Sequence, residues 1–325
     1  MTALLNAYSP SNVVTALLVL ALCLGTLAAG FGLSRMNARP VRLLTWALVA
    51  GSVSMTHFLC LDESPGFRML ALIAAGLLAM KAVVVGEERL RAMPPLSLGQ
   101  WLAFASWPGM KPRLFLSRQQ APLAMSALMK RGLLRFLWGG VFIGLAWLTW
   151  KSTRSEALST APLLIGLSLC LHFGLCNLLA AFWRSQGVAC EALFLAPLRS
   201  ENLSEFWSRR WNLAFSQMTA TAVYRPASSK FGRGLALVAS FLFSGLIHEM
   251  AISLPVQAGY GLPLGYFALH GLLVLGERSL SKRGRPIHGW LGKAWTIGCV
   301  VIPLPMLFHP AFLAGVAWPI LGIPG

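Results

Sequence analysis

Acidic residues are scarce in this chain of 325 residues. It holds 10 Asp and Glu against 27 Lys and Arg, and only 11% of its residues are charged. An ordinary soluble protein carries about a quarter charged residues, so this composition excludes a typical soluble domain. A net charge of +17 would suggest nucleic acid as the partner of a soluble protein. Here the bases lie between apolar runs of membrane-spanning length, so we expect membrane lipids as partners and no nucleic acid.

The six cysteines follow no metal-binding or redox pattern. The sequence contains no CxxC pair and no Cys/His ligand set, so we expect no disulfide, no metal and no permanently bound cofactor. GxSxG, Walker, GxGxxG and HExxH motifs are also missing, which leaves serine-hydrolase chemistry unsupported. We find no internal repeat, which counts against transporters built from repeated halves.

Long hydrophobic runs are abundant, with 56% hydrophobic residues and a mean hydropathy of +0.67. A membrane-spanning helix needs about 20 mostly apolar residues. The pattern therefore predicts an all-α polytopic integral membrane protein, a single domain over residues 1–325 with eight or nine spans and additional interfacial or re-entrant helices. The candidate spans are 12–33, 41–61, 67–85, 133–150, 160–183, 233–254, 259–276 and 294–309, with a short ninth at 311–323.

The positions of the basic residues predict an orientation. If the spans alternate and the N-terminus lies outside, 24 of the 27 bases, Lys81 among them, fall on the inner side. Only Arg68, Lys151 and Arg154 fall outside. The first eleven residues lack Lys and Arg, so we expect the first apolar run to be an anchor and not a signal peptide. The short chain and compact loops favour a prokaryotic inner membrane.

The segment 201–218 is rich in Trp and Arg. Asn202 and Glu205 have the spacing of a capping box, which predicts that a helix begins there. Such a helix would lie in the membrane interface, either as a simple anchor or as part of an active site in which Asn212 holds a carbonyl or an oxyanion. Its predicted apolar face holds Trp207, Trp211, Ala214, Phe215 and Met218, and its polar face Glu205, Ser208, Arg209, Asn212 and Ser216.

His248 lies in an apolar stretch, residues 241–250. An ionisable residue at membrane depth is costly, so it is a candidate functional residue. Ser240, Ser244 and His248 recur every fourth residue and predict a narrow polar stripe on one helix. Burial favours the uncharged imidazole, which is the form that a general base requires. A structural histidine beside serines that serve helix packing is the alternative.

Three segments resemble the wax synthase branch of the membrane-bound O-acyltransferase superfamily. FWSRRWN (206–212) resembles the Phe-Trp-x-Arg-Arg-Trp-(Asn/His) motif of that branch. FLFSGLIHE (241–249) resembles its Ser-Gly-(Leu)-x-His-Glu motif, which carries the histidine assigned to catalysis. FALHGLLVLGE (267–277) is similar to a Phe-x-x-His-Gly segment followed by Glu. The order and spacing of the segments match as well.

The resemblance implies a fold that surrounds an intramembrane tunnel and an enzyme that moves a fatty acyl chain from acyl-CoA, its co-substrate, to a lipophilic hydroxyl acceptor such as a long-chain alcohol. His248 would be the base and Asn212 the second active-site residue. A sterol, glycerolipid, polyketide or sugar acceptor stays possible, as does a non-catalytic lipid transporter or lipid-binding protein. Candidate donor-binding residues are Arg209, Arg210, Trp211, Arg225, Ser244 and His270, although for each single arginine ordinary positive-inside charge is the better explanation.

The predicted spans leave a conflict of depth. His248 lies about 15 residues, or roughly 22 Å, from the inner end of its helix, whereas Asn212 is expected near the inner surface. For the two to meet, that helix must start later or tilt strongly, or the 201–218 segment must dip into a protein-lined cavity.

Overall fold

The computed structural model describes residues 2–118 and 124–323, and every regular element within them is helical. This confirms the all-α prediction. Helices α3 (Pro40–Leu59) and α13 (Leu262–Lys282) match two predicted spans in position. Both contain charged side chains, with Arg42 in α3 and Glu277 in α13. The count of eight or nine spans therefore stays a prediction. Among the described residues, six stretches are long and apolar enough to cross a membrane: Val13–Ser34, Pro65–Arg89, Ser126–Thr153, Glu156–Ser185, Leu213–Val256 and Gly289–Leu307.

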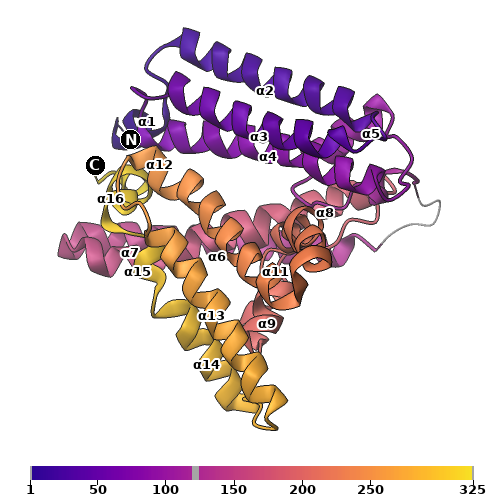
Figure 1. Cartoon of the computed structure of the whole chain (residues 1–325). Helices are drawn as coiled ribbons and strands as arrows, with labels where there is room; N and C mark the ends of the chain where they lie inside the picture. The colour runs from indigo at the N-terminus through magenta and orange to yellow at the C-terminus, as the bar shows by residue number, and fades with distance from the viewer. Residues whose placement is uncertain (1, 119–123, 324–325) are drawn as a thin grey trace.

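Helices α2 (Val13–Ser34), α3 and α4 (Pro65–Arg89) lie side by side and form one layer of the molecule (Figure 1). The α2 helix exposes a row of leucines, as a helix facing lipid does. Two-thirds of the apolar window of α4 is buried. This difference places α4 between α2–α3 and the rest of the protein.

Two basic residues of α4 are buried and bonded to main-chain carbonyls. Arg68 donates to the oxygens of Cys60 (2.8 Å), Pro255 (3.0 Å) and Glu63 (2.8 Å). The Nζ of Lys81 donates to the oxygens of Trp107 (2.5 Å) and Gly109 (2.7 Å). The Lys81 side chain is only 2% exposed, so its amino group lies inside the protein, and its place on the inner side of the membrane stays a prediction. Each side chain therefore supplies hydrogen-bond donors to main-chain carbonyls inside the protein.

Helices α6 (Ser126–Thr153) and α7 (Glu156–Ser168) form a closely packed pair behind α11 and α13 (Figure 1). A Cβ atom at Gly139 would lie 2.8 Å from the carbonyl oxygen of Gly166, and the reverse distance is the same. Small residues allow such close approach of membrane helices. The pair continues through a π-helical turn, Leu169–Leu175, into α8 (Cys176–Ser185).

The predicted helix over 201–218 is broken, and this break shapes the site. α9 (Leu203–Glu205) continues into a π-helical turn, Phe206–Arg210, which ends before Asn212. Asn212 has φ 44° and ψ 66°, a left-handed conformation that a continuous right-handed helix cannot contain. A new helix, α10 (Leu213–Thr219), begins after it. Asn202 does cap the first segment, since its Oδ1 accepts from the N–H of Glu205 at 2.8 Å.

A second break separates the two halves of the following helix. The chain runs from α10 through Ala220–Tyr224 into α11 (Arg225–His248), and Gly232 within α11 has φ 82° and ψ 167°. A glycine adopts this conformation without the steric penalty that a Cβ brings. The segment up to Tyr224, ahead of α11, and the part of α11 after Gly232 both line one cavity.

The C-terminal elements pack beside α13 and return to the N-terminus. α14 (Gly289–Val301) ends just before Pro303, and Tyr8 donates to the carbonyl of Val316 at 2.7 Å. The predicted ninth span is a short apolar helical region at Pro310–Leu321. The remaining α-helices of the described residues are α1 (Thr2–Tyr8), α5 (Leu98–Ser106), α12 (Leu254–Val256), α15 (Leu304–Leu307) and α16 (Pro310–Phe312).

Candidate functional site

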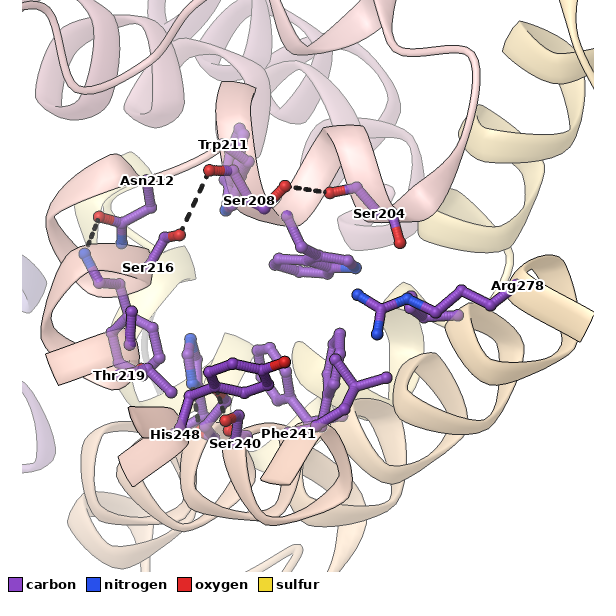
Figure 2. A pocket seen from close by; sticks show the side chains of 18 residues that line it. Ser204, Ser208, Trp211, Asn212, Ser216, Thr219, Ser240, Phe241, His248 and Arg278 are labelled. Carbon is purple, nitrogen blue, oxygen red and sulfur yellow. Dashed lines mark hydrogen bonds between the residues drawn. The ribbon is translucent and has the colours of Figure 1, made fainter. Parts of the chain in front are cut away.

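A central cavity of about 270 Å³ lies between the broken segment 204–224, α11 and α13 (Figure 2). Its volume is near the lower end for small-molecule sites, so it can hold a reacting centre but not a whole long acyl chain. Both His248 and Asn212 line it, as do Ser240 and Ser244. The depth conflict is resolved because the segment after Asn212 folds back against the second half of α11.

Both predicted faces of the 201–218 segment contribute to this one cavity. Trp207, Trp211 and Phe215 come from the predicted apolar face, and Ser208 and Ser216 from the predicted polar face. The prediction of one amphipathic helix with two opposite faces is therefore wrong. The turn at 211–212 rotates the two halves relative to each other, so residues that a straight helix would separate share the same space.

His248 is held by its own helix. Its Nδ1 lies 2.7 Å from the main-chain oxygen of Ser244. A carbonyl can only accept, so Nδ1 of the neutral ring carries the proton and Nε2 keeps its lone pair. The ring also packs on Phe267 of α13, with ring centroids 4.2 Å apart, and on Phe215 at 5.6 Å. This arrangement fixes both the tautomer and the orientation of the imidazole.

The two serines below His248 form a ladder on α11. Ser240 donates to the carbonyl of Ala236 at 2.7 Å, and Ser244 to the carbonyl of Ser240 at 2.8 Å. Each hydroxyl thus satisfies its proton within the helix while its oxygen stays on the cavity side. The predicted polar stripe is present as a surface that can accept hydrogen bonds from a ligand.

Asn212 uses one end of its amide to start α10. Its Oδ1 accepts from the N–H of Phe215 at 3.2 Å, an N-cap bond. This bond identifies the oxygen end of the amide, so Nδ2 is the end that can donate to a molecule in the cavity (Figure 2). The left-handed backbone at Asn212 is costly for a residue with a side chain and is tolerated best by Asn and Asp.

His270 does not line the central cavity, although the sequence suggests it as a binding residue. It is fully buried, and its Nδ1 lies 2.8 Å from the carbonyl of Tyr266. Its ring contacts Trp207 edge-on, with centroids 5.2 Å apart. Within this site His270 supports the tryptophan that forms the wall and does not face the space itself.

The three predicted arginines also lie outside the central cavity. Arg209 is exposed, Arg210 pairs with Glu205 at 2.6 Å, and Arg225 lies 3.7 Å from Glu88. Arg278 of α13 lines the cavity instead and enters from the side opposite His248 and Asn212 (Figure 2). No motif in the sequence marks Arg278, because this residue resembles ordinary positive charge at the end of a span.

Two carboxylates fix α13 at both ends. Glu249 of the π-helical turn Glu249–Ser253 accepts from the N–H groups of Gly261 (2.9 Å) and Leu264 (3.0 Å) at the start of α13. Near the other end, Glu277 accepts from the N–H groups of Leu203 and the indole of Trp295, at 3.0 and 2.9 Å. Negative groups stabilise helix N-termini. The two glutamates therefore hold three walls of the cavity in register.

Comparison with known proteins gives the site a family. Residues 190–268, which include both motifs and most of the cavity wall, match the membrane bound O-acyl transferase family. Residues 190–268 are thus similar to this family, whereas the rest of the chain lies outside the match. The match includes His248, Asn212 and Phe267 but stops before Arg278.

Curated plant proteins share the same part of the chain. A probable long-chain-alcohol O-fatty-acyltransferase 6 of Arabidopsis thaliana is 30% identical over 136 residues, which are 38% of this chain and 39% of the plant protein. The long-chain-alcohol O-fatty-acyltransferase of Simmondsia chinensis is 29% identical over 133 residues, 36% of this chain and 37% of that protein. The similarity thus covers about two-fifths of the length of the relatives it matches, and the predicted resemblance to the wax synthases is confirmed as a distant relationship.

Proposed function

We propose that this protein is an acyl-CoA-dependent O-acyltransferase that esterifies a lipophilic alcohol. The observation that carries the proposal is the shared cavity of His248 and Asn212, two residues 36 positions apart that lie in the two motifs of the family-matching region. The names of the plant relatives point to a long-chain alcohol as acceptor. A tunnel larger than the cavity and an inner-membrane orientation remain predictions.

In the proposed reaction, the Nε2 of His248 accepts the proton of the acceptor hydroxyl. The alcohol oxygen then forms a bond to the thioester carbon, and the carbonyl oxygen becomes an oxyanion. The tetrahedral intermediate collapses, the carbon–sulfur bond breaks, and the imidazolium returns the proton to the leaving thiolate to give CoA. General-base help of this kind contributes roughly 10²- to 10⁴-fold.

Asn212 would donate from Nδ2 to the oxyanion. A fixed donor of this type is useful because it points at the place where charge develops, and its cap bond to Phe215 already holds it there. Arg278 gives the opposite end of the cavity a positive charge, which attracts an anionic donor. The apolar walls exclude water, which would otherwise compete with the alcohol for the thioester.

The direct test is acyl transfer by the purified protein in detergent. Radiolabelled palmitoyl-CoA is offered with a panel of a long-chain alcohol, a sterol, a diacylglycerol and a sugar, using wild type, His248→Ala and His57→Ala. His57 is the matched control, because it is a histidine of α3 that does not line the cavity. We expect a labelled ester with the long-chain alcohol that falls at least about 100-fold in His248→Ala and persists in His57→Ala.

Two other results would change the assignment. An ester formed only with a different acceptor would keep the reaction and replace the substrate class. If no acceptor releases CoA from a folded wild-type protein, the enzymatic proposal fails and a lipid-binding or transport role replaces it.

A further inference from the structure

A second cavity of about 260 Å³ lies apart from the central one and is strongly basic. The start of α6 contributes Arg131 and Arg135, α8 contributes Asn177, and the loop before α9 contributes Phe194. Arg210 completes it. We call this space the basic cavity. The family-matching region includes Arg210 and Phe194 but none of the α6 or α8 residues.

Two of the three arginines of the basic cavity have no acidic partner among the residues that the structure describes. Arg131 and Arg135 are one helical turn apart on the same face, an arrangement in which like charges repel. Within residues 2–118 and 124–323, no carboxylate lies within 4.0 Å of either guanidinium, and Arg210 alone of the three pairs with one, Glu205. Arg135 instead stacks over Phe173 at 5.1 Å.

The remaining polar group is an amide. Asn177 is only 3% exposed yet lines the cavity, so its buried side chain offers hydrogen bonds to a molecule there. Guanidinium groups bind phosphate through pairs of parallel N–H bonds. Two uncompensated arginines match the charge of a phosphate monoester, about −1.5 to −2 at pH 7, better than that of a single carboxylate.

The basic cavity shares a wall with the central cavity. Arg210 lines the former, and its chain neighbours Trp211 and Asn212 line the latter. Phe194 of the basic cavity contacts Trp211 edge-on, with centroids 5.2 Å apart. An anion bound in the basic cavity would therefore lie next to the segment that contains Trp211 and Asn212.

We propose that the basic cavity binds a phosphate monoester and so holds the wall that carries Trp211 and Asn212. Two ligands bring this group to a membrane protein: the 3′-phosphate of a CoA donor and the headgroup of phosphatidic acid. The first source rests on the proposed acyltransferase function, whereas the second does not depend on it.

The test for the donor uses CoA and dephospho-CoA, which lacks the 3′-phosphate, with purified protein in an uncharged detergent. Binding is measured by calorimetry for wild type, Arg131→Gln/Arg135→Gln and Lys130→Gln. Lys130 is the matched control, because it is an exposed base of the same helix turn that does not line the cavity. If CoA is the ligand, wild type and Lys130→Gln bind it about tenfold more tightly than dephospho-CoA, and the double variant loses this preference.

The test for the lipid uses nanodiscs of phosphatidylcholine with or without phosphatidic acid. If the lipid is the ligand, phosphatidic acid raises the thermal midpoint of wild type and Lys130→Gln but not of the double variant. Equal behaviour of all three proteins in both arms overturns the proposal. If the double variant does not fold, exposed Arg131→Gln alone gives the same comparison. Neither arm needs turnover, so a failure of the acyltransferase proposal is seen separately in the ester assay.

Discussion

The α2–α4 layer and the central cavity place polar groups in apolar surroundings in two different ways. In the layer, Arg68 and Lys81 are buried, and several of their N–H groups bond to main-chain carbonyls. Around the cavity, His248 and Asn212 each use one polar side-chain atom in a hydrogen bond to the main chain, and their second polar atom has no such bond. Polar groups whose hydrogen bonds are mostly made within the protein support the fold, and groups with one unbonded polar atom beside a cavity are available for a ligand. Mutations in the two regions should therefore have different consequences.

The largest effect on stability is expected from Arg68→Ala. The substitution leaves the carbonyls of Glu63 and Pro255 without their donor, and each such loss costs about 1–3 kcal/mol. We expect destabilisation of at least about 2 kcal/mol, measured as a lower thermal midpoint in detergent. An unchanged midpoint would contradict the view that this arginine holds the loops together.

Asn212→Asp should instead reduce turnover and spare the fold. Aspartate keeps the acceptor that caps α10 and tolerates the left-handed backbone, but it has no Nδ2 to donate. Loss of one oxyanion donor costs about 2.7–4 kcal/mol, so kcat should fall by 10²- to 10³-fold with little change in KM. Asn212→Ala, which also removes the cap, should lower the thermal midpoint as well. Equal activity of Asn212→Asp and wild type would remove Asn212 from the mechanism.

Substitution of Glu249 tests whether activity requires the bond that holds the start of α13 against the end of α11. Glu249→Ala leaves the N–H groups of Gly261 and Leu264 without their acceptor, whereas Glu249→Gln retains one oxygen to accept from them. We expect Ala to lower stability by about 1 kcal/mol and to reduce kcat, and Gln to restore most of both. If Gln is as impaired as Ala, the charge of Glu249 matters for a reason other than this cap.

The smallest effect concerns Glu205 and Arg210 beside the central cavity. Desolvation by burial raises the pKa of Glu205, but hydrogen bonds from the N–H of Glu201 and from Arg210 outweigh it and lower the pKa below 4.5. A lowered pKa in the folded state adds stability above pH 4.5, and this stability is lost as pH falls through the folded value. Because the pair is partly exposed, we expect less than about 1 kcal/mol. When the pH is lowered from 6 to 3.5, the thermal midpoint of wild type should therefore fall further than that of Glu205→Gln.

Part of the site follows directly from the sequence. The spacing of Ser240, Ser244 and His248 places them on one face of any helix, and they do line the cavity together. The motif around Asn212 also indicates the second wall. Arg278 could not be found in this way, since only the packing of α13 against α11 decides which base at the end of a span faces inward.

The sequence by itself determined the helical class, the positions of the long apolar segments and the residues of the two motifs, because these depend on composition and on periodicity within one segment. Only the tertiary structure decided that the segment after Asn212 turns back and that residues from both predicted faces meet. A single left-handed residue, Asn212, and a glycine at φ 82°, Gly232, redirect the chain. Such turns leave little trace in a hydrophobic pattern, because they change the direction of a helix and not its composition.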